Sequence, residues 1–166
     1  MDEFLLKAKP YQVFLSLMIP TFFAGFIPNI NPEIPLIKAI FIVFPFVVWV
    51  YVLAKALNYC IPVRKRFSEG FLTFNLFFFC IVFVLVSMFL GGSVHFFGWA
   101  VLIPIYTIFS FFYLFYFVSK VLTSLEQGRR TSFGEHIGEM ILFLIPILGV
   151  WYIQPRINKL SEIHDS

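Results

Sequence analysis

The chain has 166 residues, of which 60% are apolar and 13% are charged, and Phe alone occurs 25 times. A folded chain of this size has too little interior to hide so much apolar surface from water, which excludes a soluble domain, a disordered chain and an ordinary nucleic-acid-binding protein. The net charge of +3 is too small to indicate electrostatic steering of anionic partners. The composition therefore predicts an integral membrane protein.

Continuous apolar runs predict transmembrane helices, because a bilayer core of about 30 Å needs roughly 20 helical residues and the runs do not alternate as barrel strands do. Lys38 and Lys55 flank the second run, where their side chains can reach the headgroups. Four spans are predicted, over residues 11–27, 34–57, 71–90 and 97–121.

A fifth apolar run, from Met140 to Ile153, is short and is interrupted by Pro146 and Gly149. Proline removes a helix hydrogen bond and forces a kink or a stop. Runs of about 10–14 residues are more often re-entrant or interfacial than spanning. We therefore predict a broken helix over about 135–153 that dips into the cytoplasmic leaflet and returns.

The polar tail follows this run. Pro155 is expected to push Gln154 out of helical geometry, because the residue before a proline is restricted. A separate amphipathic piece, residues 156–163, would then lie on the membrane surface.

The distribution of positive charge favours four spans over five. With four spans both termini are cytoplasmic, and 11 of the 12 Lys and Arg residues lie on that side, with Lys38 opposite. With five spans, Arg156 and Lys159 cross the membrane and the split becomes 9 to 3. The positive-inside rule prefers the first arrangement, and the second stays open as an alternative.

The chain also aligns with itself at an offset of 65 residues, around the ends of the second and fourth spans. A unit of two spans would keep both copies in the same orientation, as in a parallel repeat. Similar juxtamembrane chemistry without duplication is the alternative interpretation. The polar matches are Tyr51 with Tyr116, Lys55 with Lys120, Arg64 with Arg129 and Lys65 with Arg130.

The densest polar cluster is Glu135, His136 and Glu139, at the start of the broken helix. On a helix the two carboxylates share a face one turn apart, which suits a proton-responsive or cation-binding site at the cytoplasmic surface. Alternatively, the carboxylates only stabilise the first helical turn while the histidine faces water. A di-metal site needs Glu-x-x-His from two helices, so we expect no metal and no cofactor.

Polar side chains within the apolar runs are few. Ion pathways usually leave ionisable residues inside spans, and the first, third and fourth spans have none in their central stretches. Asn75 is expected to form a hydrogen bond with a neighbouring helix. The candidate intramembrane polar residues are Asn75, Ser87, Thr107 and Ser110.

Basic residues gather beside the spans on the predicted cytoplasmic side. They can fix the orientation of the chain and do nothing else. They also lie within reach of anionic headgroups or of a cytoplasmic protein partner. These residues are Arg64, Lys65, Arg66, Arg129, Arg130, Arg156 and Lys159.

Both ends of the chain carry recognisable patterns. Near the N-terminus, Lys-x-Lys-x-x-Gln-x-Phe is formed by Lys7, Lys9, Gln12 and Phe14. Residues 146–158 read Pro-Ile-x-Gly-Val-Trp-x-Ile-Gln-Pro-Arg-Ile-Asn. In these two segments the chain resembles small bacterial multi-pass inner-membrane proteins of unknown function. The resemblance implies a bacterial inner-membrane location and brings no activity with it.

The sequence contains no nucleophile elbow, P-loop, His-Glu-x-x-His or dinucleotide signature. We therefore expect an all-α, single-domain, non-catalytic membrane subunit that self-associates or pairs with another membrane or cytoplasmic protein. One alternative is an oligomeric channel or a membrane-perturbing effector, lined by the intramembrane polar residues. Another is a lipid-handling enzyme that uses Glu135, His136 and Glu139.

Overall fold

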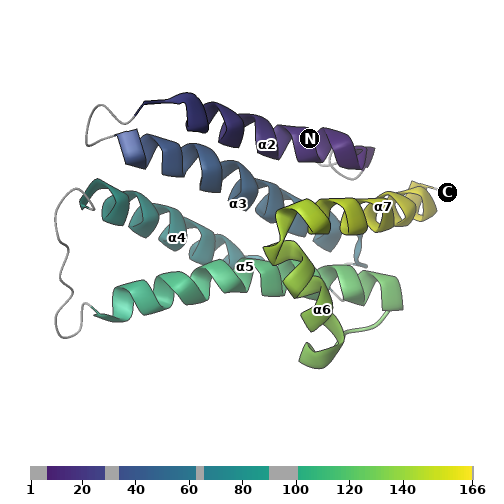
Figure 1. Ribbon diagram of the computed structural model, residues 1–166. Helices are drawn as coiled ribbons and strands as arrows, with labels where there is room; N and C mark the ends of the chain where they lie inside the picture. Colours follow the sequence, from purple (N-terminus) through teal and green to yellow (C-terminus); the bar gives the residue numbers. More distant parts are fainter. Residues whose placement is uncertain (1–6, 29–33, 63–65, 90–100, 166) are drawn as a thin grey trace.

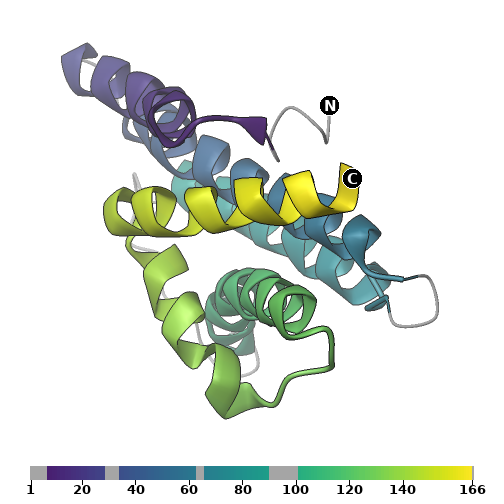
Figure 2. The ribbon, with the colours of Figure 1, turned by 90° about the vertical axis from the view of Figure 1, so that its right-hand side faces the viewer.

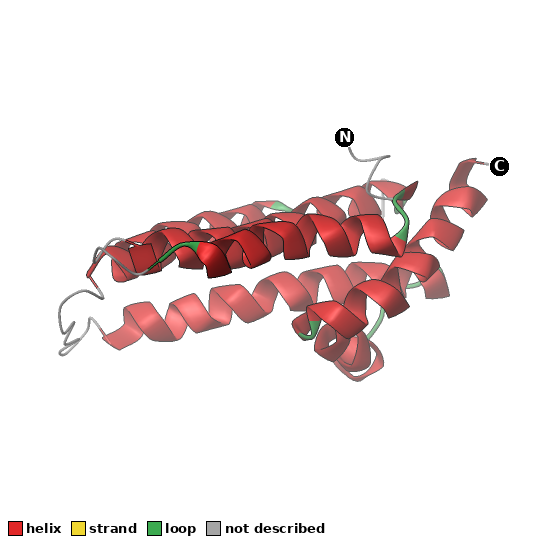
Figure 3. Ribbon diagram, turned by 45° about the horizontal axis from the view of Figure 1, so that its top comes forward, coloured by secondary structure: helices red, strands yellow, loops and turns green. Residues whose placement is uncertain are grey.

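A computed structural model describes residues 7–28, 34–62, 66–89 and 101–165. Within these ranges the chain is all-helical and no residue lies in a strand (Figures 1 and 3). In chain order the helices are α2 (Pro10–Phe26), α3 (Ile34–Cys60), α4 (Gly70–Phe89), α5 (Leu102–Gln127), α6 (Phe133–Leu144) and α7 (Pro146–Asp165).

The four apolar helices α2 to α5 lie side by side in alternating directions (Figure 1). Helix α3 is central, because it contacts α2, α4 and α5. Its buried residues Val50, Leu53, Ala54 and Leu57 recur at helical spacing and are at most 1% exposed. The facing side of α5 supplies equally buried residues, Leu114, Val118, Val121 and Leu122.

The outer faces of the bundle are apolar as well. Phe22 and Phe26 on α2, Phe77 on α4 and Ile108 on α5 are each more than half exposed. Two helices, α5 and the part of α3 from Ile37 to Cys60, are long and apolar enough to cross a membrane. Helix α2 and residues 70–86 of α4 are apolar but shorter.

Helix α5 extends six residues beyond the predicted end of its apolar run at residue 121. It stops where Gly128 adopts the left-handed conformation, with φ of 65°, and donates its backbone N–H to the Leu125 carbonyl. Glycine adopts this conformation without the steric cost that other residues meet. The additional turn carries the buried Ser124, so burial rather than apolar composition continues the helix.

The C-terminal helices α6 and α7 break where Pro146 predicts a break. Helix α6 ends at Leu144, and Pro146 opens α7, a position at which the missing N–H of proline costs no helix bond. A Cβ atom added to Gly149 would lie 2.2 Å from the Leu142 carbonyl oxygen. The turn is therefore tight enough to require glycine at position 149.

The predicted second break, at Pro155, is wrong. Pro155 lies inside α7, and Gln154 is helical like its neighbours. Ile153 and Ile157 are fully buried on either side of the proline, so packing holds the helix together across the lost hydrogen bond. Residues 156–163 are accordingly the second half of α7 and not a separate piece.

One end of the bundle gathers most of the connections. The described N-terminal segment, the ends of α3 and α5, and helices α6 and α7 all meet there (Figure 1). Seen from that end, α7 crosses over the ends of the other helices, and α6 packs beside α5 (Figure 2). The opposite end carries the turns 29–33 and 90–100, which lie outside the described residues.

Candidate functional site

Glu135 stabilises the start of α6. Its carboxylate accepts a hydrogen bond from the backbone N–H of Ser132, at 2.8 Å, and pairs with the Arg129 guanidinium at 2.6 Å. The hydrogen bond from Arg129, followed by that from Ser132, lowers the pKa of Glu135. Both partners come from the turn before α6, so Glu135 closes that turn and caps the helix.

Glu139 belongs to a three-helix ion-pair node. The Arg156 guanidinium, from α7, lies 3.1 Å from Glu139 on α6. The Arg156 Nε also donates to Glu126 on α5, at 2.8 Å. One arginine thus ties together the three helices of the basic end.

His136 is fully buried, which corrects the expectation that it faces water. Its ring packs edge-on against Tyr116 and Phe133, with ring centroids 5.2 and 5.7 Å away. Neither ring nitrogen has a hydrogen-bond partner among the described residues. Burial lowers the pKa of His136 and the charge of Lys120 adds to this, whereas the Ser132 backbone and the neighbouring carboxylates act in the opposite direction.

The cluster of three predicted site residues does not converge on a common point. Glu135 is drawn to Arg129, Glu139 to Arg156, and His136 to aromatic rings. The described residues contain no group of three His, Cys, Asp or Glu side chains that could hold a metal ion. The one-turn spacing was read correctly, but partners on other segments engage each side chain separately.

Asn75 and Ser110 form the interhelical hydrogen bond expected between α4 and α5. Ser110 donates to the Asn75 carbonyl oxygen at 2.9 Å, and both side chains are fully buried. Thr107 instead donates to the Ile103 carbonyl of its own helix. The side chain of Ser87 lies outside the described part of the chain. The placed residues therefore do not line a common path.

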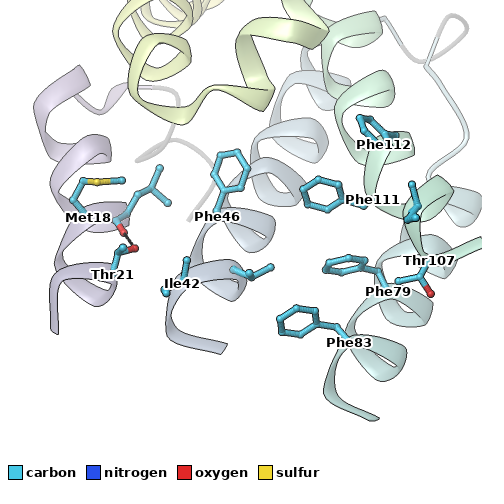
Figure 4. A pocket seen from close by; sticks show the side chains of 12 residues that line it. Met18, Thr21, Ile42, Phe46, Phe79, Phe83, Thr107, Phe111 and Phe112 are labelled. Carbon is cyan, nitrogen blue, oxygen red and sulfur yellow. Dashed lines mark hydrogen bonds between the residues drawn. The ribbon is translucent and has the colours of Figure 1, made fainter. Parts of the chain in front are cut away.

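An apolar groove of about 530 Å³ opens between helices α2 to α5 (Figure 4). Its only hydroxyl groups, on Thr21 and Thr107, each donate to a carbonyl one turn back on their own helix. A hydrophobic filling therefore suits the groove better than a polar ligand does. The lining residues are Leu17, Met18, Thr21, Ile42, Val43, Phe46, Phe79, Phe83, Thr107, Ile108, Phe111 and Phe112.

The basic residues predicted at the membrane surface have different partners. Arg66 donates to the carbonyls of Tyr59 and Ile61 and stacks over the Tyr59 ring at 5.0 Å. Lys159 is exposed on α7. Arg64 and Lys65 lie outside the described residues.

Sequence reasoning missed the ring of Phe67 and the lysine beside it. The Lys120 ammonium lies 5.2 Å from the Phe67 ring centroid and donates to the Tyr116 hydroxyl at 3.0 Å. Arg130 lies over the same Phe67 ring at 5.7 Å. The match of Lys55 with Lys120 at an offset of 65 was the signal that singled out Lys120 in the sequence.

The two terminal patterns contact each other. Gln154 and Asn158 both donate amide hydrogens to the carbonyl of Ala8, at 3.2 and 3.1 Å. The rings of Phe14 and Trp151 lie 6.2 Å apart. The segments that carry the family resemblance therefore form one structural unit.

Comparison with known proteins finds no matching family model, no similar curated protein and no similar solved structure. The resemblance of the terminal patterns to bacterial inner-membrane proteins therefore stays a prediction.

Proposed function

We propose that this protein is a non-catalytic, multi-pass membrane subunit of the bacterial inner membrane. The observation that carries the proposal is the distribution of charge over the bundle. Among the described Lys and Arg residues, all but Lys38 lie in or beside the segments that meet at the end shown on the right in Figure 1. They are Lys7, Lys9, Lys55, Arg66, Lys120, Arg129, Arg130, Arg156 and Lys159.

The lengths of the helices fit four spans. Helix α2 has 17 residues and α4 has 20, against 27 in α3 and 26 in α5. At about 1.5 Å per residue, α2 is roughly 26 Å long, slightly shorter than a typical hydrocarbon core. A mismatch of this size is accommodated by local thinning of the bilayer. In this arrangement α6 and α7 form a hairpin that enters and leaves from the basic side.

Topology is the first test of the proposal. The positive-inside rule places the basic end, with both termini, in the cytoplasm. A reporter that is active only in the periplasm should stay silent when fused after Ser166. It should become active when inserted after Pro32, in the connection between α2 and α3. An active fusion after Ser166 would contradict the four-span arrangement.

The proposed subunit role rests on the groove. Phe22 and Phe26, which are 66% and 69% exposed, follow the groove residue Thr21 on the same helix. A projection and a hollow on one surface allow a self-complementary contact between two copies related by a two-fold axis. We propose that a second copy inserts these rings into the groove.

The oligomeric state tests this contact. In lipid nanodiscs the native chain should have the mass of two copies. Phe22→Ala with Phe26→Ala should shift the population to single chains, since the inserted rings are lost. Phe77→Ala on α4, which is similarly exposed but does not line the groove, is the matched control. A single-chain mass for the native protein would reject self-association through the groove.

A further inference from the structure

The ring of Phe67 holds two cations from different segments. Lys120, from α5, and Arg130, from the turn before α6, lie 5.2 and 5.7 Å from its centroid. An aromatic face attracts each cation, but it does not cancel their mutual repulsion. Two positive charges are thus held beside one ring.

Neither of these cations has a carboxylate partner among the described residues, whereas their neighbours do. Arg129 pairs with Glu135, and Arg156 pairs with Glu126 and Glu139. Lys120 instead donates to the neutral hydroxyl of Tyr116. The carboxylates of the basic end are therefore engaged elsewhere, and positive charge remains around Phe67.

The equivalent lysine of the repeat shows the contrast. Lys55 lies over Tyr51, as Lys120 lies over Tyr116, at 5.7 and 5.2 Å from the respective ring centroids. Glu69 lies 3.8 Å from Lys55 and compensates its charge. In the second unit the corresponding glutamate, Glu135, is bound to Arg129. Lys120 therefore occupies the same local setting as Lys55 without its counter-charge.

The position of Phe67 is fixed by the buried Asn58. The Asn58 amide donates to the Phe67 carbonyl at 2.9 Å, and its oxygen accepts from the Phe67 N–H at 3.0 Å. The turn that carries Arg130 is closed by a hydrogen bond between the buried hydroxyls of Ser124 and Thr131, at 3.0 Å. Both supports of the site are thus in place before any ligand arrives.

A hollow of about 110 Å³ adjoins this site. It is smaller than the roughly 300–1,000 Å³ of pockets that enclose whole small molecules. A group such as a phosphate suits its size, and its lining includes Phe67, Ser124 and Arg130.

We propose that Lys120 and Arg130 bind the phosphate of an anionic membrane lipid beside the ring of Phe67. Arginine supplies planar paired donors and lysine a compact charge, a combination that suits phosphate oxygens. The acyl chains lie along the outward side chains Phe71 and Phe74 of α4, which are about half exposed. This inference rests on the proposed membrane topology, which places the basic end at headgroup level.

Lipid retention tests the site. The full chain, purified in mild detergent, is mixed with phosphatidylglycerol, with phosphatidylcholine or with inorganic phosphate, and bound molecules are counted by native mass spectrometry. The native chain should retain phosphatidylglycerol in preference to phosphatidylcholine. Lys120→Gln with Arg130→Gln should weaken this binding roughly thirtyfold, from about fivefold for each cation at a membrane surface.

Two single variants are matched controls. Lys55→Gln removes the equivalent lysine whose charge Glu69 compensates, and Lys159→Gln removes an exposed cation of the same end. Both should leave retention within about twofold of the native value. Lys120→Arg with Arg130→Lys should restore most of the binding and thereby show that the glutamine variant lost charge rather than fold.

Several outcomes would overturn the site. Equal retention of phosphatidylglycerol by the native chain and the glutamine double variant would do so, as would equal weakening by Lys55→Gln. Phosphate binding that is lost in the double variant supports the site and assigns it to the free ion if lipid does not bind. The topology reporters are independent: correct topology without lipid discrimination rejects only this site, and an active fusion after Ser166 rejects the proposed topology.

Discussion

At the residue scale, local spacing and actual surroundings diverge most clearly in the segment from Glu135 to Glu139. The two carboxylates pair with arginines from other segments, and the histidine between them is buried against rings. Bringing an imidazolium into such a site is costly without a hydrogen-bonded partner. His136 is therefore a residue whose ionisation opposes the fold.

Protonation of His136 should make the protein sensitive to mild acid. The pKa of this group is lowered in the folded state, so the unfolded chain binds the proton first as the pH falls below about 6.5. Stability is complete above that pH and decreases below it. The thermal midpoint in detergent should fall between pH 7.5 and 5.5, and His136→Phe should flatten this dependence.

Glu135 does not confuse this measurement. Its pKa is lowered on folding, so its contribution is present above about pH 4.3 and is lost only as the pH falls further. An unchanged slope between pH 7.5 and 5.5 in His136→Phe would show that other groups cause the acid sensitivity.

Asn75 should contribute to packing and not to transport. Asn75→Leu removes the bond with Ser110 and is expected to cost about 1 kcal/mol, because interhelical hydrogen bonds in membranes are modest. Unfolding in mixed micelles measures this cost. Ser110→Ala should cost a similar amount, and the double variant less than the sum of the two. Complete loss of function in a folded Asn75→Leu protein would contradict a packing role.

At the element scale, the hairpin of α6 and α7 depends on close backbone contact. Gly149 faces the Leu142 carbonyl, whereas Gly138 in α6 has open space around the position of a side chain. These two glycines have opposite reasons for their stability effects. One is required by its surroundings, and the other only weakens its helix.

Alanine substitution should separate the two glycines. Gly149→Ala is expected to destabilise the protein by about 2 kcal/mol or more, because a Cβ would force the backbones apart. Gly138→Ala should stabilise it by about 0.5–1 kcal/mol, since alanine has less backbone entropy to lose in a helix. Chemical unfolding in micelles measures both. A neutral Gly149→Ala would show that the hairpin opens readily.

At the scale of the whole molecule, the two ends of the chain hold each other. The carbonyl of Ala8 accepts from Gln154 and Asn158, which lie about one turn apart on α7. This contact joins segments almost 150 residues apart in sequence. It places α7 against α2 and encloses the basic end of the bundle.

Loss of this contact should release the N-terminal segment. In Gln154→Leu with Asn158→Leu, trypsin should cleave after Lys7 at least several times faster than in the native chain, because the backbone at Ala8 is no longer held. Lys159→Gln, on the same helix, is the control. Equal cleavage rates in all three proteins would mean that other contacts of α2 retain the segment.

The sequence by itself determined the helical runs, the break at Pro146 and the glycine after it. Each depends on neighbouring residues: continuous apolar composition, a missing N–H and a missing side chain. The membrane location and the number of spans were predicted on the same grounds, and two helices meet the length and composition required.

Only the tertiary structure decided the surroundings of the polar residues. The partners of Glu139, His136 and Gln154 lie on α5, α7 and the N-terminal segment, so no local spacing could reveal them. Pro155 stayed helical for the same reason, because Ile153 and Ile157 pack against the core on both sides of it. Local chemistry fixed where helices begin and break, whereas long-range packing fixed which side chains are buried, paired or left with uncompensated charge.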